Sequence, residues 1–301
     1  PTYNNGHLIG HAIASVVKQT YQNWELIIID NFSVDNTLKV IRAFKDPRIK
    51  IIQNNNNGVI ANARNKGITT ASGDWIAYLD SDDVWTSNKL SLCLELGYGY
   101  QLVYHQLQKF KLYQDGSIKT LGITRIKNLE LSPYKLLRRY GPCLTTSAIF
   151  MKKDLVSKVG LFDEDTQIVR GEDYDYWFRI AQSGARFKYI DEVLGGYQIE
   201  ANNVTSAEKS IRIVNYLSHK HFSHSNDPIW IHVTEIISAL KLKKFRLALR
   251  YYLNLLRDKN PFKVFQVSFI ILTKFFELKR SLREKPSLIH STNLGERINS
   301  D

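Results

Sequence analysis

The chain has 301 residues, of which 44% are hydrophobic, a content that can fill a sizeable core and excludes global disorder. It carries 41 Lys or Arg against 29 Asp or Glu, so its formal net charge is +12. Its two cysteines, Cys93 and Cys143, lie far apart, which excludes a disulfide framework or a zinc site and favours reduced thiols in a cytoplasmic compartment.

The first hundred residues alternate helix and strand signals. Apolar residues at helical spacing predict helices over 7–19, 36–44 and 58–71. Short apolar runs predict strands over 25–30, 48–53 and 74–79. This order predicts an α/β fold whose mostly parallel sheet is flanked by helices. The opening segment 1–5 has the composition of a loop that follows a strand, and we expect that strand, absent from this sequence, to be central in the sheet.

The rest of the chain changes character twice. Residues 101–205 mix strand and helix signals, with a hairpin turn at 114–116, a strand at 145–151 and a helix at 173–184. From about Ser206, long basic and apolar helices dominate, and 13 Lys or Arg face 3 Asp or Glu between 241 and 285. We therefore predict a catalytic domain over 1–205, with halves 1–100 and 101–205, and a helical basic C-terminal region over 206–301.

Three carboxylates, Asp80, Asp82 and Asp83, follow the apolar run "WIAYL" within four positions. One of them can cap a helix, but three like charges this close need a positive partner. A calcium loop starting at Asp80 is excluded, because Val84 and Trp85 stand where it needs an acid and a glycine. A D-x-D at a strand end suits Mg²⁺ or Mn²⁺ bridged to a diphosphate, and ligands of open α/β sheets bind at that edge.

Two further acidic segments allow both a structural and a functional interpretation. Asp30 and Asn31 end a predicted strand, where they form an ordinary turn or accept hydrogen bonds from a nucleotide base or ribose. In "RGEDYDYWFR", Asp175 is spaced to pair with Arg179 one helical turn later. Asp173 caps a helix or acts as a general base, since partial desolvation beside aromatic residues raises a carboxylate's proton affinity.

Together these segments resemble the family 2 glycosyltransferases of the GT-A fold, of the kind that build bacterial polysaccharide and lipopolysaccharide. The resemblance covers about residues 1–205 and rests on "PTYNN", "SVVKQTYQNWELIIIDNFSVDNT", "NARNKGITTASGDWIAYLDSDD", "VGLFDED" and "GEDYDYWFRIA", which occur in family order at similar spacing. It implies an inverting transfer of a sugar from a nucleotide diphosphate donor, usually a UDP-sugar, to a hydroxyl of a glycan or lipid-linked acceptor. It also implies a bound Mn²⁺ or Mg²⁺.

The resemblance implies roles for individual residues. Asp173 is the catalytic base, and Glu172 and Trp177 shape the acceptor pocket. Asp80 and Asp82 touch ribose and metal, with Asp83 as a further metal ligand. The donor-binding residues that it implies are Thr2, Tyr3, Asp30, Asn31, Arg64, Asp80 and Ser81.

Two segments depart from the family pattern. Asn31 stands where a second acid is frequent, which removes a charge from the site for the base. The Tyr-Arg-x-His typical of the end of the domain is here Tyr197, Gln198, Ile199 and Glu200. The chain therefore lacks the Arg and His that usually face the phosphates or the metal.

Alternatives stay open for the C-terminal region and for the whole chain. Residues 241–285 form a helical cap with a solvated basic face, or they contact an anionic membrane surface. A non-catalytic nucleotide-sugar binder, a nucleotidyltransferase or a basic nucleic-acid-binding protein are the other classes. The chain has no recognised nucleic-acid motif and no glycine-rich phosphate loop, so we expect no nucleic acid partner. We expect a cytoplasmic protein, peripheral at the cytoplasmic face of the membrane.

Overall fold

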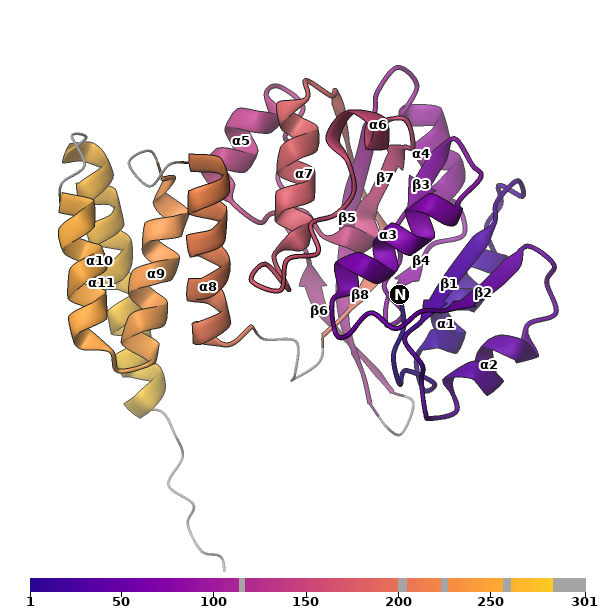
Figure 1. Ribbon diagram of the computed structural model, residues 1–301, viewed down its shortest axis with the longest axis horizontal. Coiled ribbons are helices and arrows are strands. Elements are labelled where there is room, and N and C mark those ends of the chain that lie inside the picture. Colours follow the sequence, from indigo (N-terminus) through magenta and orange to yellow (C-terminus); the bar gives the residue numbers. More distant parts are fainter. Residues whose placement is uncertain (114–116, 200–204, 223–226, 257–260, 284–301) are drawn as a thin grey trace, which may run out of the picture.

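The computed structural model describes residues 1–113, 117–199, 205–222, 227–256 and 261–283, with side chains up to Thr273. Its elements run from an α/β part at one end of the molecule to a set of helices at the other (Figure 1). The α/β class, with a sheet flanked by helices and a helical C-terminal region, confirms the predicted fold class. The predicted hairpin turn at 114–116 lies outside the described residues.

The first part of the chain forms a small parallel sheet with its helices. Strands β1 (Leu26–Asp30) and β2 (Ile49–Gln53) pair in parallel, with Asp30 opposite Gln53. Helices α1 (Ile9–Val17) and α2 (Thr37–Ala43) pack against them through a cluster of isoleucines. The predicted helices and strands of this part are confirmed, as are α3 (Ile60–Thr70) and β3 (Trp75–Ala77), although the third strand is shorter than expected.

A larger sheet has the strand order β3-β7-β5-β8-β4, and β6 pairs with the C-terminal half of β5. Its further strands are β4 (Val84–Trp85), β5 (Leu102–Leu112), β6 (Ile118–Ile123), β7 (Ile149–Lys152) and β8 (Phe187–Gln198). Only β5 and β8 are parallel among these pairs, so the expectation of mostly parallel pairing needs correction for this sheet. A short connection such as that between β5 and β6 allows only an antiparallel pair.

Helices cover both faces of the larger sheet. Successive β5 residues alternate between faces, so Leu102 and Tyr104 join one core while Val103 joins the other. On the first face lie α3, α5 (Pro133–Tyr140), α6 (Leu155–Val159) and α7 (Glu172–Gln182), and on the second lie α1 and α4 (Lys89–Leu96). A short 3₁₀ turn, η1 (Thr146–Ala148), leads into β7, which therefore begins later than predicted.

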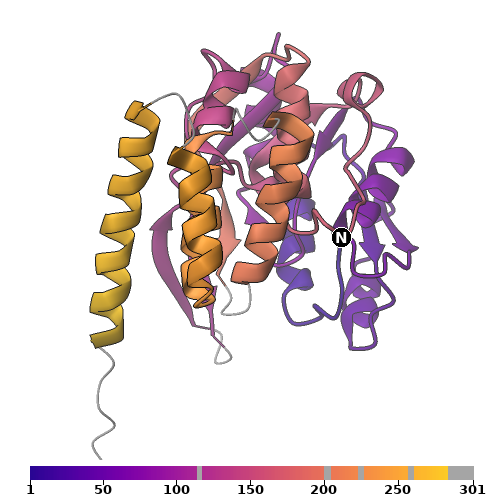
Figure 2. The ribbon, with the colours of Figure 1, turned by 60° about the vertical axis from the view of Figure 1, so that its left-hand side comes forward.

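The C-terminal helices continue the first core before they form their own. Ile213 of α8 (Ala207–Leu217), Phe222 of η3 (Ser218–Phe222) and Ile231 of α9 (Ile229–Lys241) belong to the same hydrophobic cluster as the sheet. Helices α10 (Phe245–Leu256) and α11 (Pro261–Arg283) then pack on α9, at the far end of the molecule (Figure 2). The boundary predicted at residue 205, between the catalytic domain and the C-terminal region, thus lies within a single hydrophobic cluster. None of the helices in the described ranges combines the length and apolarity needed to cross a bilayer.

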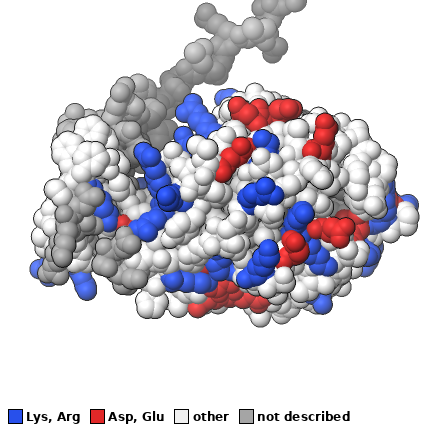
Figure 3. Space-filling view, turned by 90° about the horizontal axis from the view of Figure 1, so that it is seen from above, with Lys and Arg blue, Asp and Glu red and all other residues white. Residues whose placement is uncertain are grey.

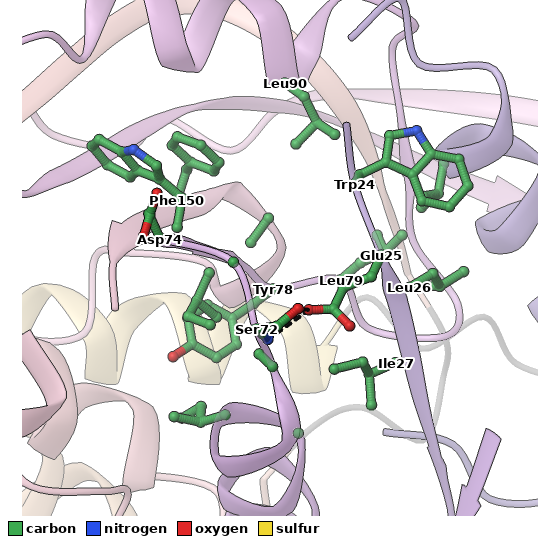
Figure 4. Close-up of a pocket in the computed structure, with 18 of the residues that line it drawn as sticks. Trp24, Glu25, Leu26, Ile27, Ser72, Asp74, Tyr78, Leu79, Leu90 and Phe150 are labelled. Atoms are coloured by element: carbon green, nitrogen blue, oxygen red, sulfur yellow. Dashed lines mark hydrogen bonds between the residues drawn. The ribbon is translucent and has the colours of Figure 1, made fainter. Parts of the chain in front are cut away.

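A cavity of about 570 Å³ separates the small sheet from the larger one. Trp24, Leu26 and Ile27 line it on the side of β1, and Phe150 and Tyr78 line it on the side of β3 (Figure 4). Thr2 pairs with the end of the β1 edge that faces this cavity, as its N–H donates to the carbonyl of Ile29. The central strand expected from the sequence stays a prediction.

Candidate active site

Arg64 is the centre of an acidic cluster that draws on three separate parts of the chain. On α3 it lies on the same buried face as Ala61 and Ile68, and it is 7% exposed. Its Nη2 donates to Asp80 Oδ1 over 3.1 Å, and its Nη1 donates to Glu172 Oε1 over 2.8 Å. Charge-assisted hydrogen bonds to both carboxylates hold the end of β3 against the start of α7.

The loop after β3 carries the D-x-D, and the structure gives its three acids different surroundings. Asp80 and Asp82 are half-buried, whereas Asp83 is fully buried. Asp83 accepts hydrogen bonds from Ser147 Oγ at one oxygen and from the Gln198 N–H at the other. Burial and the neighbouring Asp80 and Asp82 raise the pKa of Asp83 well above its usual range. Asp83 therefore shapes the loop, while Asp80 and Asp82 remain nearer to solvent.

Asp173 lies in the first turn of α7, beside Glu172. Its Oδ1 accepts a hydrogen bond from the Tyr174 N–H over 2.7 Å. Burial and the adjacent Glu172 carboxylate raise the pKa of Asp173 to about 6, against the opposing effect of Arg64. Asp80 also contributes to this shift, so Asp173 and the D-x-D lie in one electrostatic environment. A carboxylate with a pKa near neutrality is suited to accept a proton.

Two residues of this site receive no role from the sequence: Ser147 carries no signal, and Tyr197 is noted only as the start of a segment that departs from the family pattern. Ser147 Oγ accepts a hydrogen bond from the Asp80 N–H and donates to Asp83, so it fixes both ends of the D-x-D turn. Tyr197 lies near all four acids, and burial, Asp83, Asp80, Asp82 and Asp173 together raise the pKa of its hydroxyl to about 12. Tyr197 thus faces the site where the family pattern has its Tyr-Arg-x-His.

The predicted donor loop is hydrogen-bonded to both β1 and the D-x-D. Thr2 is buried and bridges to Asp30, whereas Tyr3 is 58% exposed. Asn5 Nδ2 donates to Ser81 Oγ over 2.8 Å, which joins this loop to the D-x-D turn. The predicted donor-binding segments therefore form one continuous surface at the carboxyl ends of β1 and β3.

Asp30 and Asn31 are both engaged within the protein. Asp30 is fully buried, and its carboxylate accepts hydrogen bonds from the N–H and Oγ of Ser33. Asn31 is half-buried, and its Oδ1 accepts a hydrogen bond from the Asn56 N–H. In this structure Asp30 organises the loop that follows β1.

The sequence singles out two further residues of α7, Trp177 and Asp175. Trp177 is 1% exposed and packs edge-on against Tyr78 and Phe162, in the core beneath the site, and its role in shaping an acceptor pocket stays a prediction. The predicted pair of Asp175 with Arg179 is confirmed at 2.9 Å. Lys220 and His221 of η3 also contact Asp175, which ties the C-terminal helices to α7.

The residues at the D-x-D fit a divalent cation that completes its shell with a ligand. In the described parts of the chain, no group of three or more His, Cys, Asp and Glu is placed to hold a metal ion unaided. Asp80 and Asp82 supply two hard oxygen donors at a solvent-accessible strand end. Magnesium and manganese bind in this way, with one or two carboxylates and substrate phosphates. Arg64 lines the cavity between the sheets, but Asp80, Asp82 and Asp173 do not, so this cavity is separate from the candidate active site.

Comparisons with known proteins agree on one family. The model of glycosyl transferase family 2 matches residues 1–159. The chain is 33% identical over 180 residues to WfgD of Escherichia coli, a UDP-Glc:alpha-D-GlcNAc-diphosphoundecaprenol beta-1,3-glucosyltransferase, covering 60% of this chain and 67% of the relative. It is 31% identical to WfaP of the same organism, which has the same described activity, over 68% of this chain and 77% of the relative.

Solved structures show the same fold. Staphylococcus aureus TarS, in complex with UDP-GlcNAc, superposes with a TM-score of 0.58 over 84% of this chain and 88% of that one. The same protein in complex with UDP gives a TM-score of 0.55 over 84% and 87%. Sequence identity is 14% in both cases, so this likeness concerns the fold.

Proposed function

The chain belongs to glycosyl transferase family 2, and we propose that it transfers a sugar from a UDP-sugar to a hydroxyl of a lipid-linked glycan, with inversion at the anomeric carbon. The observation that carries this proposal is the single Arg64 that joins Asp80 of the D-x-D to Glu172 beside Asp173. It supports a donor diphosphate and an acceptor hydroxyl meeting in one site.

Asp80 and Asp82 would hold Mn²⁺ or Mg²⁺ together with the donor diphosphate. When bound, such an ion offsets the negative charge of the departing diphosphate. Tyr3 and Ser81 lie on the loops beside these acids and contact the nucleotide in this proposal. Asp30 and Asn31 act one step back, because their side chains accept hydrogen bonds from the loop backbone, and Thr2 pairs with β1 through its main chain.

Asp173 acts as the general base. Its carboxylate removes the proton of the acceptor hydroxyl as that oxygen bonds to the anomeric carbon. The bond from the anomeric carbon to the diphosphate breaks, and its electron pair leaves with the nucleotide. Attack from the face opposite the leaving group inverts the configuration. General base assistance of this kind typically contributes about 10²–10⁴ in rate.

Glu172 and Arg64 position this base. Arg64 neutralises part of the charge of Asp80 and Glu172, which keeps three carboxylates together near the substrate. Glu172 Oε2 also accepts a hydrogen bond from the Arg170 N–H, which fixes the start of α7. Both residues thus act through Asp80 and Asp173.

The acceptor and the location follow from relatives. WfgD and WfaP act on a sugar linked to diphosphoundecaprenol, and we propose an acceptor of this lipid-linked class for this chain in polysaccharide biosynthesis. Such an acceptor is met at a membrane, which supports a cytoplasmic protein that works at the membrane surface.

A screen of UDP- and GDP-sugars tests the proposal. Each donor is offered with lipid-linked GlcNAc acceptor, with Mn²⁺ and with chelator, and transfer is followed by product mass. We expect transfer from one UDP-sugar that depends on the divalent ion. A protein that binds UDP-sugars but forms neither product nor free UDP would instead be a non-catalytic binder, and one that binds none would refute the proposal.

A further inference from the structure

The two last helices expose apolar side chains in regular rows. On α10 the exposed residues are Phe245, Leu249, Leu253 and Leu256, spaced by three or four positions. Their exposed fractions lie between 48% and 67%. Residues at this spacing lie on one face of a helix. On α11 the same pattern is formed by Phe265, Phe269 and Leu272.

The two rows belong to one surface, which we call the outer face. Leu255 of α10 and Val267 of α11 are fully buried against α9, so these positions mark the inward side of each helix. Tyr252 Oη and Ser268 Oγ are 3.0 Å apart and mark the seam between the helices. On each helix, the apolar row lies beyond the seam residue as seen from the buried residue, toward the opposite side of the helix. In an antiparallel pair this places both rows on the side away from α9.

Positive charge borders the outer face, and the parts of its helices whose side chains are described carry no acidic residue. Residues 241–256 and 261–273 contain no Asp or Glu. Exposed cations at 241–250 are Lys241, Lys243, Lys244, Arg246 and Arg250, and none pairs with a carboxylate of the described chain. In Figure 3, seen from above, blue and red are interspersed over the α/β part, and the described atoms visible at the left-hand end are mostly white and blue.

We propose that the outer face of α10 and α11 docks on an anionic membrane surface. Phenylalanine and leucine rows enter the interface, and the bordering Lys and Arg contact acidic headgroups. A second copy of the chain would bring the same cations against each other in a symmetric contact, which disfavours it. The proposal extends the proposed function by naming where the enzyme meets a lipid-linked acceptor, but it does not depend on the donor.

Vesicle co-sedimentation of the full chain tests this docking without any turnover. We expect binding to phosphatidylcholine vesicles that contain about one-third phosphatidylglycerol, and little to phosphatidylcholine alone. Arg246→Gln with Arg250→Gln should weaken binding roughly 25-fold, at about fivefold for each cation. Leu249→Ser with Phe269→Ser should weaken it by about 100-fold, because each side chain loses an apolar environment.

A matched control uses exposed apolar residues of the catalytic sheet. Leu121→Ser with Ile123→Ser changes side chains that are 44% and 42% exposed on β6, and it should leave vesicle binding unchanged. Equal binding to neutral vesicles, or equal loss in this control, would overturn the proposal. So would a stable dimer that Leu249→Ser with Phe269→Ser dissociates, or a preference for duplex DNA over vesicles. Sugar transfer to a short water-soluble acceptor is measured alongside, so that failure of docking is distinguished from failure of the proposed function.

Discussion

Arg64 and Glu172 are 108 residues apart in the chain, yet Nη1 of one donates to Oε1 of the other over 2.8 Å in a buried pair. The same guanidinium reaches Asp80, so one cation joins the loop after β3 to the start of α7. Buried charges of this kind are retained where they are paired. Arg64 thus explains how Asp80, Glu172 and Asp173 remain close together despite their like charges.

Glu172→Gln tests how this cluster sets the pKa of the proposed base, Asp173. The Glu172 carboxylate helps burial to raise the pKa of Asp173 to about 6, and Gln removes that charge. The pKa of Asp173 should fall, so the acid limb of kcat/KM should move below its wild-type position near pH 6. A pH profile of transfer checks this. An acid limb that stays in place or moves upward would contradict the assignment.

Asp82→Ala and Asp83→Asn should separate metal binding from loop structure. Asp82→Ala should weaken Mn²⁺-dependent UDP binding about tenfold or more, because a hard oxygen donor is lost. Asp83→Asn should keep the Mn²⁺ dependence and leave the fold at least as stable at pH 7, because burial raises the pKa of Asp83 and a carboxamide can accept from the Gln198 N–H through its oxygen while donating to Ser147 Oγ through its nitrogen.

Calorimetry with and without Mn²⁺, together with thermal melting, measures both effects. Loss of the Mn²⁺ dependence in Asp83→Asn with an unchanged Tm would assign the metal to Asp83 instead.

Much of this site follows from the sequence, and part of it does not. An apolar strand followed by Asp80 and Asp82 predicts a site at a sheet edge from local pattern alone. The burial of Trp177 does not follow, because a helix with acids and aromatics in adjacent positions does not reveal which face meets the core. Ser147 and Tyr197 are brought to the acids only by the pairing of β7 and β8 in the larger sheet, which no local signal encodes.

Asp173→Asn should stabilise the protein at neutral pH. The pKa of Asp173 is raised from 3.8 to about 6 on folding, so the folded state favours the protonated form and ionisation costs stability as pH rises through this window. The variant should therefore have a higher Tm than wild type at pH 7, and the difference should shrink towards pH 4. A lower Tm at pH 7 would argue against a desolvated carboxylate.

Lys89→Met should also stabilise the fold. Lys89 is fully buried, its Nζ lies 3.8 Å from the centroid of the Trp85 ring, and it has no hydrogen-bond acceptor among the described residues. Burial lowers its pKa from 10.5 to about 8, so charging it costs stability below pH 8 and nothing above about 10.5. We expect a gain of about 1–3 kcal/mol at pH 7 that disappears at high pH.

Denaturant unfolding at several pH values measures this gain. A loss of stability at pH 7 would mean that the contact with Trp85 outweighs the cost of burying the charge.

The central claim is that Asp173 performs the proton transfer at a donor held by Asp80 and Asp82. It is tested most directly by measuring sugar transfer and UDP-sugar affinity together in Asp173→Asn, with Glu192→Gln, an exposed acid on β8, as the matched control. The account predicts that Asp173→Asn loses at least about 10²-fold in transfer while its donor affinity and the control's activity stay at wild-type values. Transfer within a few-fold of wild type in Asp173→Asn would contradict it.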